Sequence, residues 1–390
     1  MSNRQTSRPS SPPAFLQDQP TQDPTGPLQE VVDAHLGYEA SGEAEERLPG
    51  ITEARRKRSL QEIAISKDAL IDEINELSHQ DAESETVLYL AYGSNMCAKT
   101  FKGVRGIKPL AKTNVVVPEL RLTFDLPGIP YLEPCFANVA YRRGESQASP
   151  GTVNDKEKDP LVPARHLPGY RKDRWKKGLV GVVYEITKND FAKIIKSEGG
   201  GASYQNVLTT CHPLEDGQGV PLVPITAPFK AYTLYSPGAQ ATASAGTQPL
   251  RSDGLHRIDP GYAQASARYL KLLTDGSWEQ GLPSEYRSYL QGIRPYRITS
   301  FRQRIGKYLF AGLWAPAVMT VFAGAKLFAD KTGKSPAWIV ASTMLMFRVA
   351  WSSYDVFFCP VFGDGERTIE DREDEIQKEE MEEGTMYYTP

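Results

Sequence analysis

The stretch LYLAYGSNM, residues 88–96, is the point where a buried strand meets a polar turn. Residues 86–92 are apolar and rich in β-branched and aromatic side chains, which predicts a buried strand. Gly93, Ser94 and Asn95 then favour a sharp turn. A strand that ends in such a turn leaves backbone N–H groups without a sheet partner, and these groups suit carboxylates and other anions. The stretch is therefore either an ordinary tight turn or an anion-binding loop.

Strand patterns follow this turn, and helical patterns come near the end of the same region. Strand composition recurs along the chain, and residues 187–190 resemble the capped start of a short helix that the glycines at 199–201 would end. Helical spacing appears over 262–274 and again from Pro283 onward. Because strands come first and helices later, we expect an α+β fold. The expected strands are residues 86–92, 115–117, 120–124, 136–141, 179–186, 204–210 and 229–235.

Three blocks of sequence resemble the γ-glutamylcyclotransferase family. They are YLAYGSNM at 89–96, the GVVY strand at 181–184 followed by Glu198-Gly199, and LPSEYRSYL at 282–290. The resemblance covers roughly residues 86–294 and implies a compact mixed β-barrel with peripheral helices. It also implies that Glu198 is the catalytic acid/base. The substrate-binding residues that it implies are Tyr92, Gly93, Ser94, Asn95, Tyr204 and Tyr232.

The reaction of this family needs few chemical groups. In a γ-glutamyl amide the free α-amine attacks the γ-carbonyl and closes the five-membered ring of 5-oxoproline, releasing the second amine. Both reacting groups belong to one molecule, so an enzyme has mainly to hold the near-attack conformer. One carboxylate can take the proton from the attacking amine and give it to the leaving amine. Backbone N–H groups of the turn could hold the α-carboxylate or the developing negative charge. No metal or other cofactor is expected.

Composition limits the other classes of function. The 390 residues carry a net charge of −3, which gives no reason to expect a nucleic-acid partner. Four widely spaced cysteines, Cys97, Cys135, Cys211 and Cys359, form no CxxC pair, which fits a reducing compartment. The N-terminus lacks the apolar core of a signal peptide. These features indicate a cytoplasmic location, and the resemblance implies a catalytic domain with a small-molecule γ-glutamyl substrate. The sequence does not indicate the oligomeric state.

The N-terminal region is polar, and a long insertion interrupts the strands. Residues 1–58 are expected to be disordered, with a basic run at 55–58 that is either a solvated charge cluster or a localisation signal. Residues 59–85 predict an amphipathic helix and linker that lead to a catalytic domain over 86–300. The basic insertion at 142–177 is a surface loop, a lid over the site or a surface for an acidic partner. Because this insertion and the three glycines after Glu198 depart from the family pattern, the resemblance leaves the substrate open.

The C-terminal region is apolar and ends in an acidic tail. Residues 308–325 contain no charge, and 336–358 are apolar except for Arg348 and Asp355. An apolar helical hairpin over 305–360 is therefore expected, which crosses or enters a membrane, packs on the catalytic domain or forms an oligomer interface. Residues 364–390 predict a solvated acidic tail. The alternative to an enzyme is a non-catalytic, membrane-associated binding or scaffold protein that keeps the fold.

Overall fold

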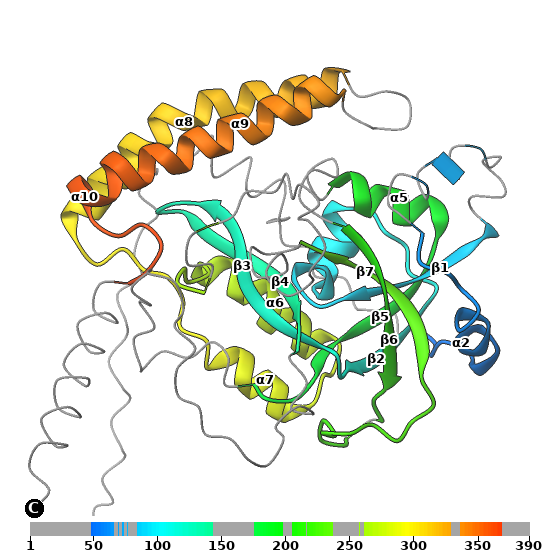
Figure 1. Cartoon of the computed structure of the whole chain (residues 1–390). Helices are drawn as coiled ribbons and strands as arrows, with labels where there is room; N and C mark the ends of the chain where they lie inside the picture. The colour runs from blue at the N-terminus through cyan, green and yellow to red at the C-terminus, as the bar shows by residue number, and fades with distance from the viewer. Residues whose placement is uncertain are drawn as a thin grey trace, which may run out of the picture.

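Strand β1 (Thr86–Ala91) is central to the observed architecture because it pairs with strands on both sides. In this computed structural model the described residues are 48–65, 69, 72, 73, 76, 84–142, 175–197, 205–215, 217–236, 257, 261–328 and 336–368. Five strands close into a barrel in the order β1-β5-β2-β6-β7 (Figure 1). Their bounds are Ala111–Val117 for β2, Leu179–Thr187 for β5, Gln205–Pro213 for β6 and Phe229–Tyr235 for β7.

The barrel is mixed in strand direction, as the resemblance implied. β1 runs parallel to β7, with Tyr89 opposite Tyr232, and all the other neighbours are antiparallel. Most β1 and β5 side chains are buried on both faces, because helices and loops cover the outside of the barrel while the inside is filled. The prediction of an α+β fold built on a compact mixed barrel is therefore confirmed.

Short helices flank the barrel where the sequence carries capping residues. α5 (Lys188–Ser197) begins as predicted, with Thr187 Oγ1 accepting the N–H of Asp190 at 3.1 Å. α6 (Ala267–Glu279) begins with Ser266 Oγ accepting the N–H of Tyr269 at 3.0 Å, and α7 (Ser284–Gln291) follows the predicted Pro283 start. The strands β3 (Leu120–Ile129) and β4 (Glu133–Tyr141) form a separate hairpin. Both are longer than the expected strands 120–124 and 136–141, because β3 continues to Ile129 and β4 begins at Glu133.

The segment before β1 differs from the sequence-based expectation. Helix α2 (Glu53–Ser59) occupies part of the region expected to be disordered. Of the helix expected over 59–85, residues 62–65 are not helical, whereas the described residues 69, 72, 73 and 76 are. Arg55 is buried: its Nε and Nη2 donate to Thr86 Oγ1 and O at 3.2 and 3.0 Å, and its Nη1 contacts Glu62 at 3.0 Å. The prediction was wrong here because the contacts that order Arg55 come from residues distant in sequence. Residues 1–47, most of 66–83 and 143–174 of the insertion lie outside the described residues.

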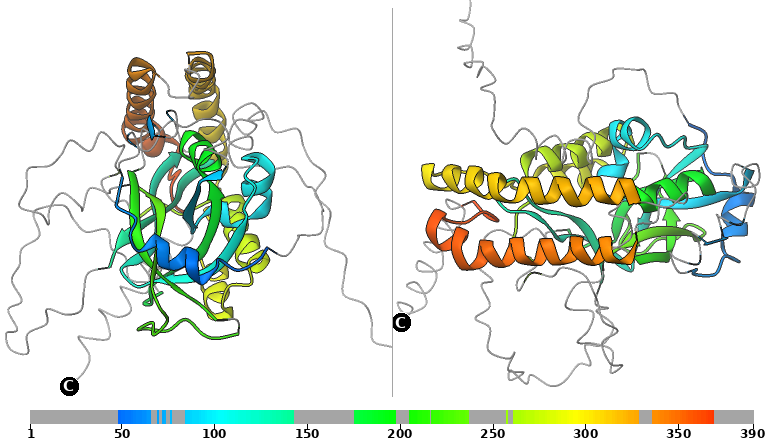
Figure 2. Two further views of the ribbon diagram at one scale, coloured as in Figure 1. Left: turned by 90° about the vertical axis from the view of Figure 1, so that its right-hand side faces the viewer. Right: turned by 90° about the horizontal axis from the view of Figure 1, so that it is seen from above.

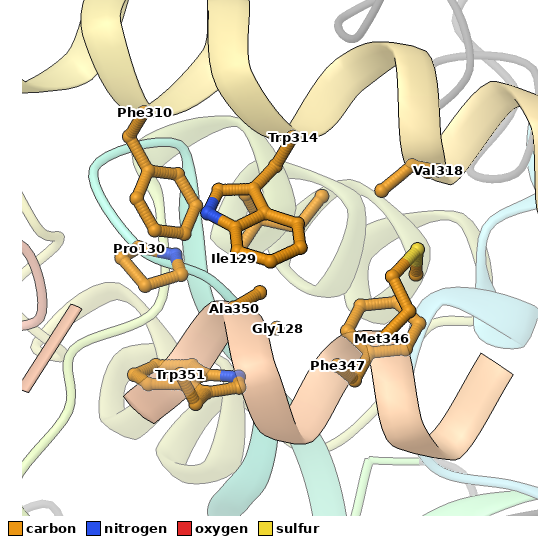
Figure 3. A pocket seen from close by; sticks show the side chains of 10 residues that line it. All are labelled: Gly128, Ile129, Pro130, Phe310, Trp314, Val318, Met346, Phe347, Ala350 and Trp351. Atoms are coloured by element: carbon orange, nitrogen blue, oxygen red, sulfur yellow. The ribbon is translucent and has the colours of Figure 1, made fainter. Parts of the chain in front are cut away.

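Two long helices lie side by side along one side of the molecule (Figures 1 and 2). α8 (Phe301–Phe328) passes through Pro316 without ending, and α9 (Ala337–Ser353) runs back beside it. Their inner side chains pack on the tip of the β3–β4 hairpin around a small apolar notch of about 10 Å³ (Figure 3). In the described part of the chain, neither of these helices nor any other is long and apolar enough to cross a membrane. A membrane span over 308–358, one of the alternatives for this region, is therefore not found among the described residues.

The chain after α9 returns to the barrel side of the molecule instead of entering solvent. After a π-helical turn (Tyr354–Phe358) and the short α10 (Cys359–Phe362), residues 366–368 are buried. Tyr131, at the β3–β4 tip, donates from its hydroxyl to Gly363 O at 2.8 Å and from its backbone to Gly365 O at 2.8 Å. The first residues of the expected solvated tail are thus packed, because tertiary contacts supply partners for their polar groups. Residues 369–390 lie outside the described part.

A cluster of charged side chains holds the chain after α10 against the region before α6. Arg257 donates to Glu366 at 2.6 Å and to Asp355 at 2.7 Å, and its guanidinium lies 4.1 Å from the centre of the Trp351 ring. Burial raises the pKa of Glu366 to about 7, although the charge and hydrogen bonds of Arg257 act in the opposite direction. The cluster joins α9, the residues after α10 and the region before α6.

Candidate active site

The predicted substrate turn lies directly at the end of β1 and is buried. Tyr92, Ser94 and Asn95 are all less than a tenth exposed. The N–H groups of Met96 and Cys97 donate to the oxygens of Gly93 and Ser94 at 3.0 and 3.1 Å, closing a short 3₁₀ turn (Ser94–Met96). Within the described part of the chain, the N–H groups of Gly93 and Ser94 have no hydrogen-bond acceptor. The turn therefore presents two backbone donors, which are suited to an anionic group.

Contacts from other elements hold the turn in place. The hydroxyl of Tyr92 donates to Leu234 O on β7 at 2.7 Å, and Thr233 Oγ1 donates to Leu90 O at 3.0 Å. On the other side, Gln280 Nε2 donates to Met96 O at 3.0 Å. Tyr92 was predicted to bind substrate, but its hydroxyl is used to attach the end of β1 to β7. Its role in the structure is to position the turn.

Tyr269, on α6, faces the turn although the sequence analysis did not single it out as a site residue. A Cβ added to Gly93 would lie 3.4 Å from the Tyr269 hydroxyl oxygen and 3.6 Å from the Cβ of Ala137. The same hydroxyl accepts the N–H of Ala137 on β4 at 3.1 Å. The available sequence signal was Ser266 three residues before Tyr269, since a capped helix start fixes where its first-turn side chains lie. Gly93 is thus the position at which α6, β4 and the turn meet.

A row of aromatic side chains covers one face of the barrel beside the turn. Tyr184, Tyr89 and Tyr232 are aligned across β5, β1 and β7, and the rings of Phe101 and Phe191 pack on them. Asn95 donates from its side-chain amide to the Tyr89 hydroxyl at 2.8 Å. Among the predicted substrate-binding residues, Asn95 therefore has its amide directed at this aromatic row.

Tyr232, another predicted substrate-binding residue, donates its hydroxyl to Ile63 O at 2.8 Å. Burial raises the pKa of Tyr232 to about 12, with further contributions from Glu62 and Glu73, so the phenol is neutral near pH 7. The structure thus uses this hydroxyl to hold the segment before β1 on the barrel. It does not leave the hydroxyl directed at the Gly93 turn.

Glu198 and Tyr204 lie outside the described residues, but the elements on either side of them are described. The N–H of Lys188, the first residue of α5, donates to Glu85 O at 2.9 Å just before β1, and Phe191 packs on Tyr89 farther along β1. α5 therefore runs along β1 towards the Gly93 turn. β6 begins at Gln205 opposite Tyr235, the last residue of β7, and β7 is parallel to β1. The end of α5, before Glu198, and the start of β6, after Tyr204, therefore both point to the end of the barrel that carries the Gly93 turn.

No metal-binding cluster of three or more His, Cys, Asp or Glu side chains occurs within the described ranges. A polar cavity of about 190 Å³ lies between the β6–β7 connection and the start of α7, and its lining includes Asn114, Glu215 and Arg287. Neither the Gly93 turn nor Tyr269 lines it. This cavity is therefore separate from the candidate active site.

Comparison with known proteins identifies a common family. A family model described as the AclK C-terminal domain matches residues 300–361, which contain α8 and α9. The chain is 28% identical over 291 residues to the gamma-glutamyl cyclotransferase gliK of Aspergillus fumigatus, covering 72% of this chain and 89% of that relative. It is 31% identical over 193 residues to the gamma-glutamyl cyclotransferase verK of Clonostachys rogersoniana, covering 49% of this chain and 88% of that relative. A solved gamma-glutamyl cyclotransferase structure covers 55% of this chain and 92% of its own, at 16% identity and a TM-score of 0.35.

The protein is an α+β barrel enzyme with a buried polar turn at the end of β1 and a C-terminal pair of helices. It belongs to the gamma-glutamyl cyclotransferase family, of the fungal type that carries the AclK C-terminal domain. The resemblance seen in the sequence is therefore confirmed, and a γ-glutamyl substrate follows from the family. The alternative of a non-catalytic scaffold is not supported.

Proposed function

We propose that this enzyme converts a γ-glutamyl amide into 5-oxoproline and a free amine, with Glu198 as the general acid/base. The α-amine nitrogen bonds to the γ-carbonyl carbon, and the bond from that carbon to the leaving nitrogen breaks. A free α-amino group has a pKa of about 8, so a base is needed to bring it to the nucleophilic form near pH 7. Between its ammonium form and the lactam N–H the α-amine nitrogen gives up two protons, and the leaving nitrogen gains two as it departs as an ammonium. Glu198 carries these protons from one nitrogen to the other, so no net proton is gained or lost.

The Gly93 turn would hold the glutamyl end of the substrate. The observation that carries this assignment is the buried turn at the end of β1, whose Gly93 and Ser94 N–H groups have no acceptor in the described part of the chain. They are available for the α-carboxylate or for the oxygen on which negative charge develops. Tyr269 borders the same space and is a further candidate for substrate contact.

The course of the chain supports placing Glu198 at this turn. Glu198 directly follows α5, which runs along β1 towards Gly93, and β6 resumes at Gln205 at the same end of the barrel. In this proposal Tyr204 contributes to the substrate pocket by family resemblance. Tyr232 is assigned instead to holding the segment before β1, because its hydroxyl is bonded to Ile63 O.

We place the reaction in the cytoplasm and the catalytic unit over residues 86–300, with the segment from Gly50 to Ile65 packed on it. All four cysteines are free thiols, three of them buried, which suits a reducing compartment. Gly50 forms a bridge with Lys112 on β2, and Ile51 is buried. Truncation to residues 86–300 should therefore lower stability even though the proposed reacting residues are retained.

The test is a screen of γ-glutamyl dipeptides, γ-glutamyl amines and glutathione adducts for release of 5-oxoproline by the purified protein. Glu198→Gln keeps the size of the side chain but removes the proton-transferring carboxylate, and we expect it to lower kcat by at least about a hundredfold. Glu215→Gln, in an exposed loop, is the matched control and should be unchanged. Normal turnover by Glu198→Gln would disprove the assigned role.

A further inference from the structure

The two C-terminal helices present an apolar surface on the side that faces away from the barrel. Inward-facing residues such as Phe310, Val318 and Ile339 are buried, while the opposite side of each helix is exposed. Leu313 is 59% exposed and Leu345 is 63% exposed, although neither belongs to a loop. We use the term outer face for Phe301, Ile305, Leu309, Leu313, Met319, Leu327, Trp338, Leu345 and Val349, all exposed on α8 and α9.

The spacing of these side chains places them on one side of each helix. On α8, Phe301, Ile305 and Leu309 follow at intervals of four, and the exposed series continues through Leu313. On α9, Trp338 and Leu345 are seven residues apart, which places them two turns apart on one side of the helix. α8 has 28 residues, so the strip is about 42 Å long. An exposed apolar surface of this extent marks an interaction site.

The charged residues within α8 and α9 themselves are all basic. Neither α8 nor α9 contains an acidic residue, whereas Arg302, Arg304 and Arg348 are exposed on them. Two more exposed arginines, Arg294 and Arg297, precede α8. Apolar side chains flanked by arginines match a surface with an apolar interior and anionic groups at its edge. A layer of anionic lipids has this composition.

A second copy of the chain fits the same surface less well. A symmetric dimer would bring two outer faces together, because a two-fold axis pairs a patch with itself. Arg302, Arg304 and Arg348 would then be desolvated against their own copies with no acid from either helix to match them. The charge pattern therefore favours lipid over self-association.

We propose that the outer face binds the surface of membranes that contain anionic lipids. α8 and α9 lie in the plane of the interface, with Leu313 and Leu345 inserted among the acyl chains and the arginines at the level of the phosphates. This arrangement needs no membrane-spanning helix, in agreement with the lengths and composition of the described helices. The barrel would then remain on the aqueous side, attached through the β3–β4 tip.

The experiment is flotation of the full-length protein with vesicles of phosphatidylcholine, with or without roughly one-third phosphatidylserine. We expect flotation with the anionic vesicles and its loss at high salt, because salt screens the arginines. The double variant Leu313→Asp with Leu345→Asp should reduce the bound fraction at least about tenfold. The control is Val223→Asp with Ile225→Asp, at even more exposed apolar positions in the β6–β7 connection, and it should float normally.

Two further measurements separate the outcomes. Arg304→Gln with Arg348→Gln should reduce binding to anionic vesicles and weaken its salt dependence, while all variants release 5-oxoproline from a soluble substrate at the wild-type rate. No flotation of the wild type, or equal flotation of the Leu313 and Leu345 double variant, would overturn the proposal. A dimer in light scattering that this variant dissociates, without flotation, would assign the face to a second copy and would also overturn it.

Discussion

The hydroxyl oxygen of Tyr269 lies 3.4 Å from the position that a Cβ on Gly93 would occupy. This relationship joins α6 to the end of β1, two elements far apart in the sequence. Gly93 has a φ of −114°, so a left-handed backbone is not the reason for a glycine at this position. What the glycine sets is proximity: a side chain at position 93 would occupy the space beside the Tyr269 hydroxyl and the Ala137 side chain.

Filling this space tests whether it holds the substrate. Gly93→Ala makes only ordinary van der Waals contacts, so the free energy of unfolding should change by less than about 1 kcal/mol. We expect kcat/KM for a γ-glutamyl substrate to fall by roughly tenfold or more, and further in Gly93→Val, because the substrate is displaced. Gly103→Ala is the control, since its added Cβ would meet no atom within 4 Å. Unchanged kinetics in Gly93→Val would place the substrate elsewhere.

Tyr92 and Tyr232, the two described tyrosines among the predicted site residues, should behave differently when their hydroxyls are removed. Tyr232→Phe loses its bond to Ile63 O, near the surface, and should cost about 1 kcal/mol of stability with kcat and KM unchanged. Tyr92→Phe leaves the carbonyl of Leu234 without its donor in a buried place. It should cost about 1–3 kcal/mol and lower kcat because the turn loses its attachment. A raised KM in Tyr232→Phe with unchanged stability would restore Tyr232 as a substrate-binding residue.

Within the basic run at 55–58, Arg55 should contribute to stability, whereas the exposed Arg58 should not. Arg55→Ala removes the bonds to Thr86 and leaves the carboxylates of Glu62 and Glu185 without their cation. Because these carboxylates are partly exposed, we expect a loss of about 2–3 kcal/mol in urea unfolding. Arg58→Ala, an exposed residue of the same helix, should change stability by less than about 0.5 kcal/mol. Equal effects of the two variants would contradict a structural role for Arg55.

Titration of Glu366 should make the free energy of unfolding fall as the pH rises towards 7. Its pKa is raised from 4.5 to about 7 in the folded protein, so the folded state binds this proton more tightly than the unfolded state. The contribution of Glu366 to the free energy of unfolding is therefore greatest below pH 4.5, and it falls as the pH rises towards 7. Tm measured across this range should show the fall in the wild type, and Glu366→Gln should remove that part of the slope. Glu215→Gln should keep it, and a slope unchanged by Glu366→Gln would show that other groups cause it.

The strands and the family could be predicted from the sequence because their signals are local. Alternation marked most of the strands within a few residues, and residues 187–190 carried the capping pattern that Thr187 and Asp190 form. The motif at 89–96, combined with Glu198-Gly199 and residues 282–290, indicated the family that the relatives then confirmed. These features depend on residue type and short-range spacing, which the chain carries whether or not it is folded.

The remaining features were decided by contacts between distant segments. Nothing local to Arg55 shows that it will be buried against Thr86, and nothing local to residues 364–368 shows that the β3–β4 tip will receive them. Likewise, Tyr269 borders Gly93 only because the barrel closes through the parallel pairing of β1 with β7 and α6 packs across its end. A charged or aromatic side chain is buried or exposed according to the partners that the fold brings to it. The sequence by itself therefore determined the turn and its family, whereas the tertiary structure decided which side chains surround it.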